Sequence, residues 1–319
     1  MRVIIYLMKR LVYLIPVIFL LTIFVFAIVH LLPGNPADII LGGEGGAEDP
    51  VVRATLMKEL GLDKPLLVQY GIWLWRALHG HFGKSVYSQE EVFTLILNRF
   101  PATLMLAFAA MIVSILVALP AGIISAVKRQ KPADYAAMTF ALLGISLPEF
   151  WFGIMLILAF SLWLRWLPSM GYLSPLENFF GSLKFLILPS IALGLRMAGV
   201  VTRMTRSSML DELGQDYVRT ARAKGLPERT VVFLHTLKNA LIPTVTIVGL
   251  QFGTILGGTV VIEMVFSWPG VGQLLVEGIL TRDYLVVQAA VLFISCSFVI
   301  VNFFVDFIYT ILNPRVGLE

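Results

Sequence analysis

The sequence predicts an all-α polytopic membrane protein with six transmembrane helices and both termini in the cytoplasm. Of its 319 residues, 58% are hydrophobic and 14% are charged, whereas about a quarter of the residues in a soluble domain are charged. A bilayer core about 30 Å thick needs roughly 20 apolar residues of helix, and six segments reach that length. Backbone groups in lipid must be bonded within their own segment, which predicts helices rather than strands.

The first predicted span covers residues 11–31 of an N-terminal segment, 1–32. Its apolar run resembles a signal peptide but has no small-residue cleavage site, so we expect a retained anchor. The third predicted span is long enough to tilt or to break at Pro148. The second to sixth spans form a core at 100–312, at about 103–127, 135–164, 186–205, 242–265 and 285–312.

Basic residues between the spans predict the orientation, because short cytoplasmic segments are enriched in Lys and Arg. With the N-terminus inside, the cytoplasmic segments hold more than half of the 24 Lys and Arg residues, although the outer loops are longer. This orientation makes residues 206–241 a cytoplasmic loop and residues 313–319 a cytoplasmic tail. Residues 33–99 become an external loop.

The external loop is predicted to contain amphipathic helices. Its apolar residues recur at helical spacing, with tryptophans suited to the membrane–water interface. Such a helix either lies on the outer lipid headgroups or forms a docking surface for an external partner. The residues with this spacing are Leu66, Leu67, Tyr70, Trp73, Leu74 and Leu78.

A polar island at residues 216–243 separates two apolar spans. Its basic residues outnumber its acidic ones, and its helical pattern is interrupted at Gly225 and Pro227. Glycine permits a sharp stop between helices. The island is predicted as a basic helix-turn-helix that forms a socket for a soluble partner. The alternative is an ordinary solvated loop that only follows the positive-inside rule.

The sequence shows no motif for catalysis, cofactor binding or metal binding. His79 and His81 are too few donors for a zinc or nickel site, and the single cysteine, Cys296, excludes a disulfide framework. There is no Gly-rich phosphate loop ending in Gly-Lys-Ser/Thr. The basic residues flank apolar spans in short clusters, so nucleic acid is not an expected partner.

Motifs along the whole chain carry a family resemblance. The longest, at residues 203–225, reads R-M-T-R-S-S-M-L-D-E-L-G-Q-D-Y-V-R-T-A-R-A-K-G. Others are L-G-L-D-K-P-L at 60–66, P-A-T-L at 101–104, S-L-P-E-F at 146–150, L-P-S-M-G-Y at 167–172, I-L-P-S at 187–190, F-S-W-P-G-V-G at 266–272, R-D-Y at 282–284 and N-P-R at 313–315. Together they resemble the permease subunits of the dipeptide/oligopeptide/nickel branch of ABC importers.

The chain departs from the family pattern at three positions. Arg219 stands where the broader permease pattern has a glutamate, and Lys238 stands where it has a proline. His81 replaces an aspartate in G-H-F-G at 80–83. The first two put the general docking salt bridges in doubt, although they suit the peptide branch.

The resemblance implies a type I ABC importer permease fold in the cytoplasmic (inner) membrane of a bacterium or archaeon. The expected partners are membrane lipid, a second permease subunit, two ABC ATPase subunits and an external solute-binding protein. The second permease is expected to be a paralogue, and an identical copy is the alternative. ATP and Mg²⁺ would be bound by the ATPase subunits, so the chain itself is expected to hold no cofactor and to catalyse no reaction.

The resemblance also implies that the polar island couples the permease to its ATPases. A short rigid helix followed by a glycine stop can transmit a rigid-body motion to the spans on either side. The charges at the two helix ends complement its dipole. The residues predicted for this role are Asp216, Arg219, Ala221, Arg222, Lys224 and Gly225.

Ionisable side chains within the predicted spans are the candidates for a translocation pathway, because such groups usually face a cavity or a partner. The alternative for each is interhelical pairing, or snorkelling near a helix end. Polar residues such as Gln251 are more typical of interhelical hydrogen bonds. The candidate pathway residues are Glu149, Arg196, Glu263 and Asp306.

The resemblance favours di- and oligopeptides as substrates. Nickel or another metal chelate, or glutathione, is the alternative within the same family. A secondary transporter or channel is the alternative from a different class, but it would often show inverted repeats, and none is evident.

Overall fold

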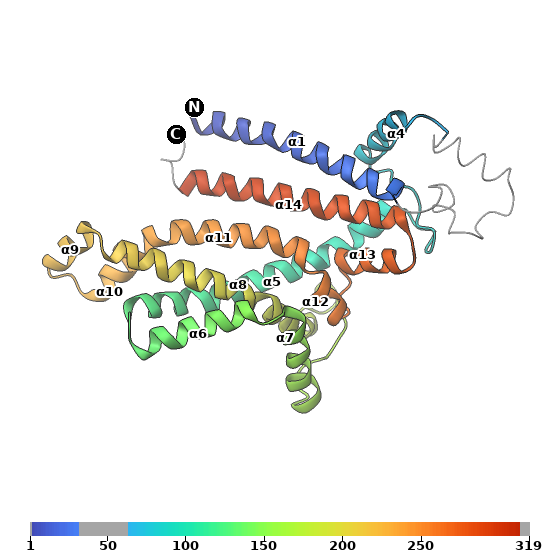
Figure 1. Cartoon of the computed structure of the whole chain (residues 1–319). Coiled ribbons are helices and arrows are strands. Elements are labelled where there is room, and N and C mark those ends of the chain that lie inside the picture. Colours follow the sequence, from blue (N-terminus) through green and yellow to red (C-terminus); the bar gives the residue numbers. More distant parts are fainter. Residues whose placement is uncertain (1, 32–62, 313–319) are drawn as a thin grey trace.

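The computed structural model describes residues 2–31 and 63–312 (Figure 1). The predicted tail, 313–319, and residues 33–62 of the external loop lie outside these ranges. Within them the chain is helical, and the only strand-like pairing is an antiparallel bridge between Lys84 and Glu91. Five helices are long and apolar enough to cross a membrane. They contain α1 (Arg2–Leu31), α5 (Val92–Val127), α8 (Phe179–Leu213), α11 (Leu237–Gly258) and α14 (Tyr284–Leu312). The stretch that contains α11 begins at Glu228.

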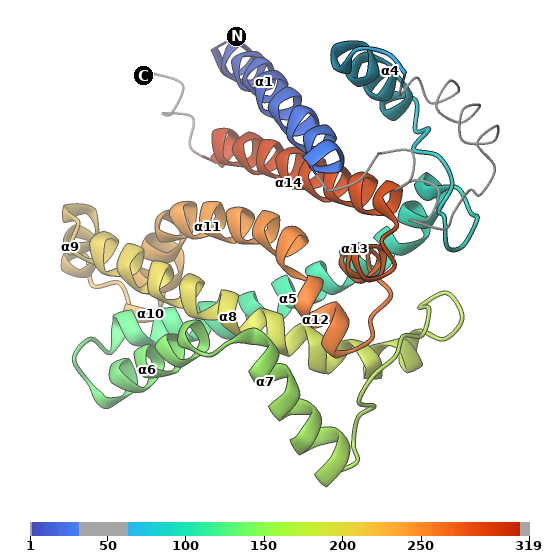
Figure 2. The ribbon, with the colours of Figure 1, turned by 45° about the vertical axis from the view of Figure 1, so that its right-hand side comes forward.

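The third predicted span is broken where the sequence suggested. Helix α6 (Pro132–Ser146) is followed by α7 (Glu149–Leu156), which continues as the π-helical segment η1 (Ile157–Trp163). The two halves differ in direction by 105°, and α7 points away from the bundle in Figure 2. A residue before proline disfavours helical geometry, and Leu147 accordingly has an extended ψ of 133°. Counted as one, the bent pair gives a sixth candidate span.

The remaining elements are short. They are α4 (Leu66–Leu78), α9 (Asp216–Ala223), α10 (Glu228–Thr230), the π-helical segment η2 (Val231–Thr236), α12 (Val260–Val265) and α13 (Val271–Leu280). Helix α4 is the helix expected from apolar spacing in the external loop. Its Tyr70 hydroxyl lies 2.7 Å from that of Thr22 on α1, while Leu67 and Leu78 are exposed.

Several helices differ in length from the spans predicted by hydropathy. Helix α8 runs beyond the predicted 186–205 at both ends, and its start is capped by Asn178, whose side chain accepts a hydrogen bond from the Gly181 amide at 2.8 Å. The predicted fifth span, 242–265, is divided between α11 and α12 at Thr259. Hydropathy marks the part of a helix that suits lipid, whereas helical hydrogen bonds continue into the aqueous ends.

Helices α5 and α8 form the centre of the bundle. Their backbones approach closely where one helix carries glycine: a Cβ at Gly194 would lie 2.7 Å from the Ala110 carbonyl oxygen, and one at Gly122 would lie 2.6 Å from the Cβ of Thr205. Small residues of this kind let helices pack tightly in lipid, where no hydrophobic force draws them together.

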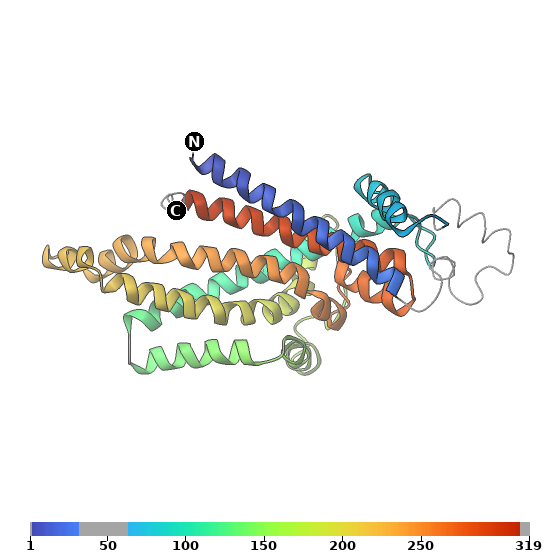
Figure 3. The same ribbon diagram turned by 45° about the horizontal axis from the view of Figure 1, so that its top comes forward.

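The two ends of the bundle carry different elements. The start of α1, the end of α14, the α5–α6 turn and the α9–α10 segment lie at one end, on the left of Figures 1 and 3, whereas α4 and α13 lie toward the other. The described parts of the segments predicted to be cytoplasmic therefore share one end. Which end faces the cytoplasm stays a prediction from the distribution of basic residues.

We expect Gly194→Ala to destabilise the protein, because the added methyl group would meet the backbone of Ala110. Overpacking of this kind lowers the free energy of unfolding by about 1–3 kcal/mol. The measurement is the thermal unfolding midpoint of the purified protein in detergent. Gly71→Ala in α4 is the control, because nothing lies within 4 Å of its Cβ position. Equal midpoints for Gly194→Ala and the wild type would contradict the close approach of α5 and α8.

Candidate functional site

Glu149 and Arg196 form an ion pair at the bend between α6 and α7. Glu149 is the first residue of α7, where a carboxylate complements the helix dipole. Arg196 lies in the middle of α8, and its Nη1 donates a hydrogen bond to Glu149 Oε1. The Glu149 side chain is 18% exposed and that of Arg196 is 60% exposed. The pair is therefore accessible from a polar space within the bundle.

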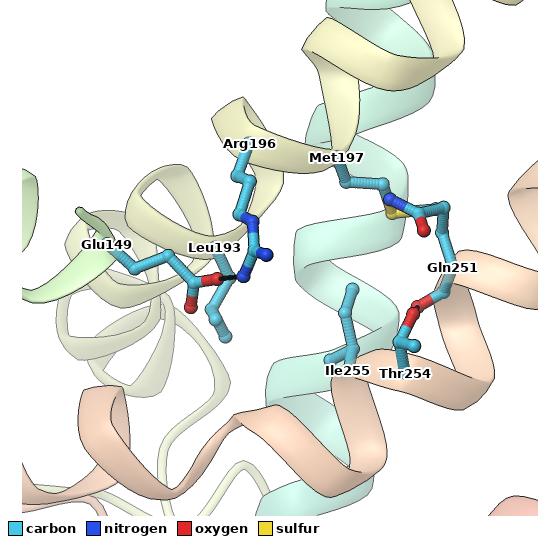
Figure 4. Close-up of a pocket in the computed structure, with 7 residues that line it drawn as sticks. All are labelled: Glu149, Leu193, Arg196, Met197, Gln251, Thr254 and Ile255. Carbon is cyan, nitrogen blue, oxygen red and sulfur yellow. Dashed lines mark hydrogen bonds and ion pairs between the residues drawn. The ribbon is translucent and has the colours of Figure 1, made fainter. Parts of the chain in front are cut away.

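That space is a cavity of about 110 Å³ between α7, α8 and α11. In Figure 4, Arg196 reaches toward Glu149, while Gln251 and Thr254 come from α11 on the other side. Its lining residues are Glu149, Leu193, Arg196, Met197, Gln251, Thr254 and Ile255. A second cavity of about 400 Å³ at the α6–α7 elbow shares Glu149 and Arg196.

The cavity combines both signs of charge with an amide and a hydroxyl group. A carboxylate on the ligand could pair with the Arg196 guanidinium, and an ammonium group with Glu149. Gln251 and Thr254 supply uncharged donors and acceptors. Sequence reasoning assigned Gln251 to interhelical bonding and missed Thr254. Their spacing of three residues on one helix, which places side chains on the same face, was the available signal.

Glu263 lies outside this cavity lining, in an enclosed network that joins α12 to α5 and α13. Its carboxylate accepts hydrogen bonds from the Thr103 hydroxyl at 2.8 Å and from the Gln273 amide at 2.9 Å. The Thr103 hydroxyl in turn accepts a bond from the Val271 amide at 2.9 Å. Gly270 leaves the space that the Glu263 carboxylate fills. Glu263 therefore fixes the start of α13 against α5.

Asp306 also lies away from the cavity lining. Its carboxylate accepts a hydrogen bond from Arg10 Nε, which joins α14 to α1. Of the four candidate pathway residues, the structure thus brings together Glu149 and Arg196, while Glu263 and Asp306 join helices elsewhere.

The α9–α10 segment has a defined turn at its centre. Gly225 follows α9 with a φ of +75°, a left-handed conformation that favours glycine. Across this turn the Arg222 guanidinium donates two hydrogen bonds to Glu228, at 2.7 and 3.2 Å. These bonds raise the pKa of Arg222 above its ordinary value. Since both side chains are about half exposed, the pair contributes about 0–1 kcal/mol and acts mainly on local geometry.

One face of α9 is buried and the other is open. Ala221 and Val218 pack with Val231 in a small apolar cluster. Asp216 and Arg219 form a weak, highly exposed ion pair at 3.4 Å. Ala221 therefore holds the helix in place, whereas the charged residues, with Lys224 and Gly225, lie on the exposed surface.

Tyr217 is a residue of this segment that sequence reasoning missed. Its hydroxyl donates a hydrogen bond to Glu212 at the end of α8 and accepts one from Asn239 Nδ2 of α11 at 3.1 Å. Partial desolvation, reinforced by the Glu212 carboxylate, raises the pKa of Tyr217. The tyrosine thus links α9 to both flanking helices.

His79 in the external loop packs against a tryptophan. The His79 ring packs on Trp75 with ring centroids 4.4 Å apart, and its Nδ1 lies 2.8 Å from the Trp75 carbonyl oxygen. Within residues 2–31 and 63–312, no three His, Cys, Asp or Glu side chains gather as a metal ion would require. The absence of a metal site from the whole chain stays a prediction.

Comparison with protein families matches both parts of the chain. Residues 118–318 match the binding-protein-dependent transport system inner membrane component. Residues 3–107 match the N-terminal region of the corresponding membrane component. Among curated proteins, the glutathione transport system permease protein GsiC of Escherichia coli K12 is 44% identical over 311 residues, 98% of each chain. GsiC of Salmonella typhi is 45% identical over the same share.

Two solved structures share the fold at low sequence identity. A chain of the methionine ABC transporter MetNI in inward-facing conformations has a TM-score of 0.58 and 18% identity, covering 69% of this chain and 96% of that one. A crystal structure of an amino acid ABC transporter with histidines gives a TM-score of 0.50 and 14% identity. It covers 70% of this chain and 94% of that one.

We expect Thr103→Val to destabilise the α5–α13 contact. The substitution keeps the shape of the side chain, but it removes one of the hydrogen bonds to the Glu263 carboxylate and leaves the Val271 amide without its Thr103 acceptor. Leaving a buried polar group unsatisfied costs about 1–3 kcal/mol, so the thermal unfolding midpoint should fall. Thr246→Val is the matched control, because that hydroxyl bonds to the Ile242 carbonyl of its own helix. A Thr103→Val midpoint no lower than that of Thr246→Val would contradict this role for Thr103.

Proposed function

Because this chain belongs to the family of binding-protein-dependent transport system inner membrane components, we propose that it forms half of the pathway through which an ATP-driven importer takes up short peptides, with glutathione as the first candidate. The chain is a permease subunit of an ABC importer and a multi-pass protein of the cytoplasmic membrane. As such a subunit it works with an ATPase and with a substrate-binding protein. The second half of the pathway is a paralogous permease, and two ATPase subunits bind the ATP and Mg²⁺.

The observation that carries the substrate is the 44% identity, over 98% of both chains, to a permease named for glutathione transport. The cavity chemistry supports the same class. Glutathione carries an ammonium group and two carboxylates, and Glu149 with Arg196 offers one partner for each charge sign. Gln251 and Thr254 add hydrogen-bonding groups that suit peptide amides.

The α9–α10 segment is the proposed contact with the ATPase. Its charged residues are exposed at the end of the bundle that carries the start of α1 and the end of α14. Its buried face and the Arg222–Glu228 bonds give it a fixed shape. A short helix held in this way passes on a displacement as a rigid body instead of absorbing it by bending.

The contact is tested with a variant that carries both Arg222→Glu and Gly225→Pro. Proline holds φ near −65°, which is incompatible with the φ of +75° at Gly225, and the glutamate would face Glu228. We expect the ATPase subunits to stop co-purifying with the permease and ATP-dependent uptake to fall by tenfold or more, a change equivalent to about 1.4 kcal/mol.

Lys128→Glu is the control for charge in that experiment. Lys128 is an exposed residue of the α5–α6 turn at the same end of the bundle, and its substitution makes the same change in charge as Arg222→Glu. It should leave both readouts unchanged. Normal docking and uptake in the double variant would mean that residues 206–241 are only a basic loop.

The pathway is tested with Glu149→Gln, assayed in the assembled importer with its binding protein. Removing one charge leaves Arg196 without its partner and the ligand ammonium without a counter-charge, so we expect glutathione uptake to fall about tenfold. Asp306→Asn is the control, since it breaks an ion pair that lies away from the cavity.

The same vesicles are offered an ordinary tripeptide and Ni²⁺. Saturable, ATP-dependent uptake of glutathione supports the proposed substrate, and uptake of the tripeptide alone would move it to other peptides. Uptake of Ni²⁺ alone would show that the importer belongs to the nickel group.

A further inference from the structure

A second ion pair joins the same two parts of the chain as Glu149 and Arg196, closer to α9. Asp134, on the first turn of α6, accepts two hydrogen bonds from Arg206 of α8, at 2.8 Å from Nε and 2.9 Å from Nη2. The same carboxylate accepts bonds from the Ser125 hydroxyl and, at 2.9 Å, from the Gln130 amide. Asp134 is 3% exposed, so its charge is satisfied by four donors from α5, the α5–α6 turn and α8.

Helices α6 and α8 are in close contact between the two ion pairs. A Cβ at Gly144 would lie 2.8 Å from the Leu195 carbonyl oxygen, and one at Gly199 would meet the carbonyl oxygen of Ala141. These contacts show that α6 and α8 run antiparallel with their backbones in close approach. Tightly packed helices that are joined by two ion pairs shift as a unit rather than deform continuously.

The two ion pairs differ in how readily they open. The Asp134–Arg206 pair is bidentate and its carboxylate is buried, so removing Arg206 would leave an uncompensated buried charge. The Glu149–Arg196 pair has one hydrogen bond, an Arg196 side chain that is 60% exposed, and a cavity beside it. The Asp134–Arg206 pair, called the tie below, therefore holds α6 against α8. The Glu149–Arg196 pair is open to a competing ligand.

We propose that Asp134 and Arg206 are positioning residues that make α6 and α8 one lever, which carries a displacement of α9 to the Glu149–Arg196 pair. Helix α8 ends at Leu213 and α9 begins at Asp216, so Arg206 lies about two turns before the end of the helix that leads into the proposed ATPase contact. Arg206 and Arg196 are ten residues apart on one helix, a rise of about 15 Å. The proposal rests on the coupling role of α9 given above.

The first test measures uptake per ATP hydrolysed in the assembled importer with Asp134→Asn. This variant weakens the tie without touching α9 or the cavity. We expect ATP hydrolysis to continue while uptake per ATP falls at least about fivefold, the lower end of typical coupling factors. Arg206→Lys keeps the charge but loses the bidentate geometry, so uptake per ATP should fall less in this variant. Arg203→Gln, an exposed arginine one turn earlier on α8, is the control.

A second test leaves the tie intact and so does not depend on the folding of a tie variant. Spin labels are placed on the exposed positions 131 and 207 through Lys131→Cys and Ser207→Cys, in a Cys296→Ser background. Dipolar broadening compares the label separation in the nucleotide-free and vanadate-trapped complexes. We expect a change no larger than about 2 Å, the scale of ordinary helix shifts.

The outcomes separate the lever from the function on which it rests. A wild-type ratio of uptake to hydrolysis in Asp134→Asn, or a larger change in label separation, overturns the lever alone. Normal docking and uptake in the Arg222→Glu, Gly225→Pro variant overturn the coupling role of α9. If Asp134→Asn does not assemble, the label separation decides.

Discussion

The close approach of α8 to its neighbours is the constraint on which the rest of the structure depends. Lipid gives apolar helices no reason to associate, so the bundle relies on van der Waals contact between backbones and on polar ties. Gly194 provides that contact toward α5 and Gly199 toward α6. The same helix carries Arg196 and Arg206, and it leads directly into α9. A change in the position of α8 therefore moves residues of the cavity and of the α9–α10 segment together.

The ionisable side chains within the bundle meet the same physical problem in different ways. A bare charge in a low-dielectric interior is strongly unfavourable. Asp306 is paired with a cation on a neighbouring helix, and Glu149 is paired beside a polar cavity. The environment of Glu263 instead consists of a hydroxyl group and backbone amides. Of these three carboxylates, Glu149 is the one that lines the cavity described above, which is the reason for proposing it for the pathway.

The sequence allowed the spans and the break at Pro148 to be predicted, because the thickness of a bilayer and the geometry of proline act locally. It did not allow the ends of α8 to be placed, since the last turns of a helix in water carry no apolar signal. The sequence also did not allow the ion-pair partner of each charged side chain to be predicted. Glu149 and Arg196 are 47 residues apart, and hydropathy alone ranks Glu263 beside Glu149 although their surroundings differ.

The π-helical segment η2, which ends one residue before α11 begins, has a consequence for the cavity. In this segment each turn holds more residues than an ordinary α-turn, and the Thr236 hydroxyl bonds back to the Val231 carbonyl at 2.9 Å. Each residue of an α-helix advances the side chains by about 100° around the axis. The extra residue accommodated in η2 therefore sets the rotational phase of all of α11. Segment η2, about four turns before Gln251, therefore determines whether Gln251 and Thr254 point into the cavity or into lipid.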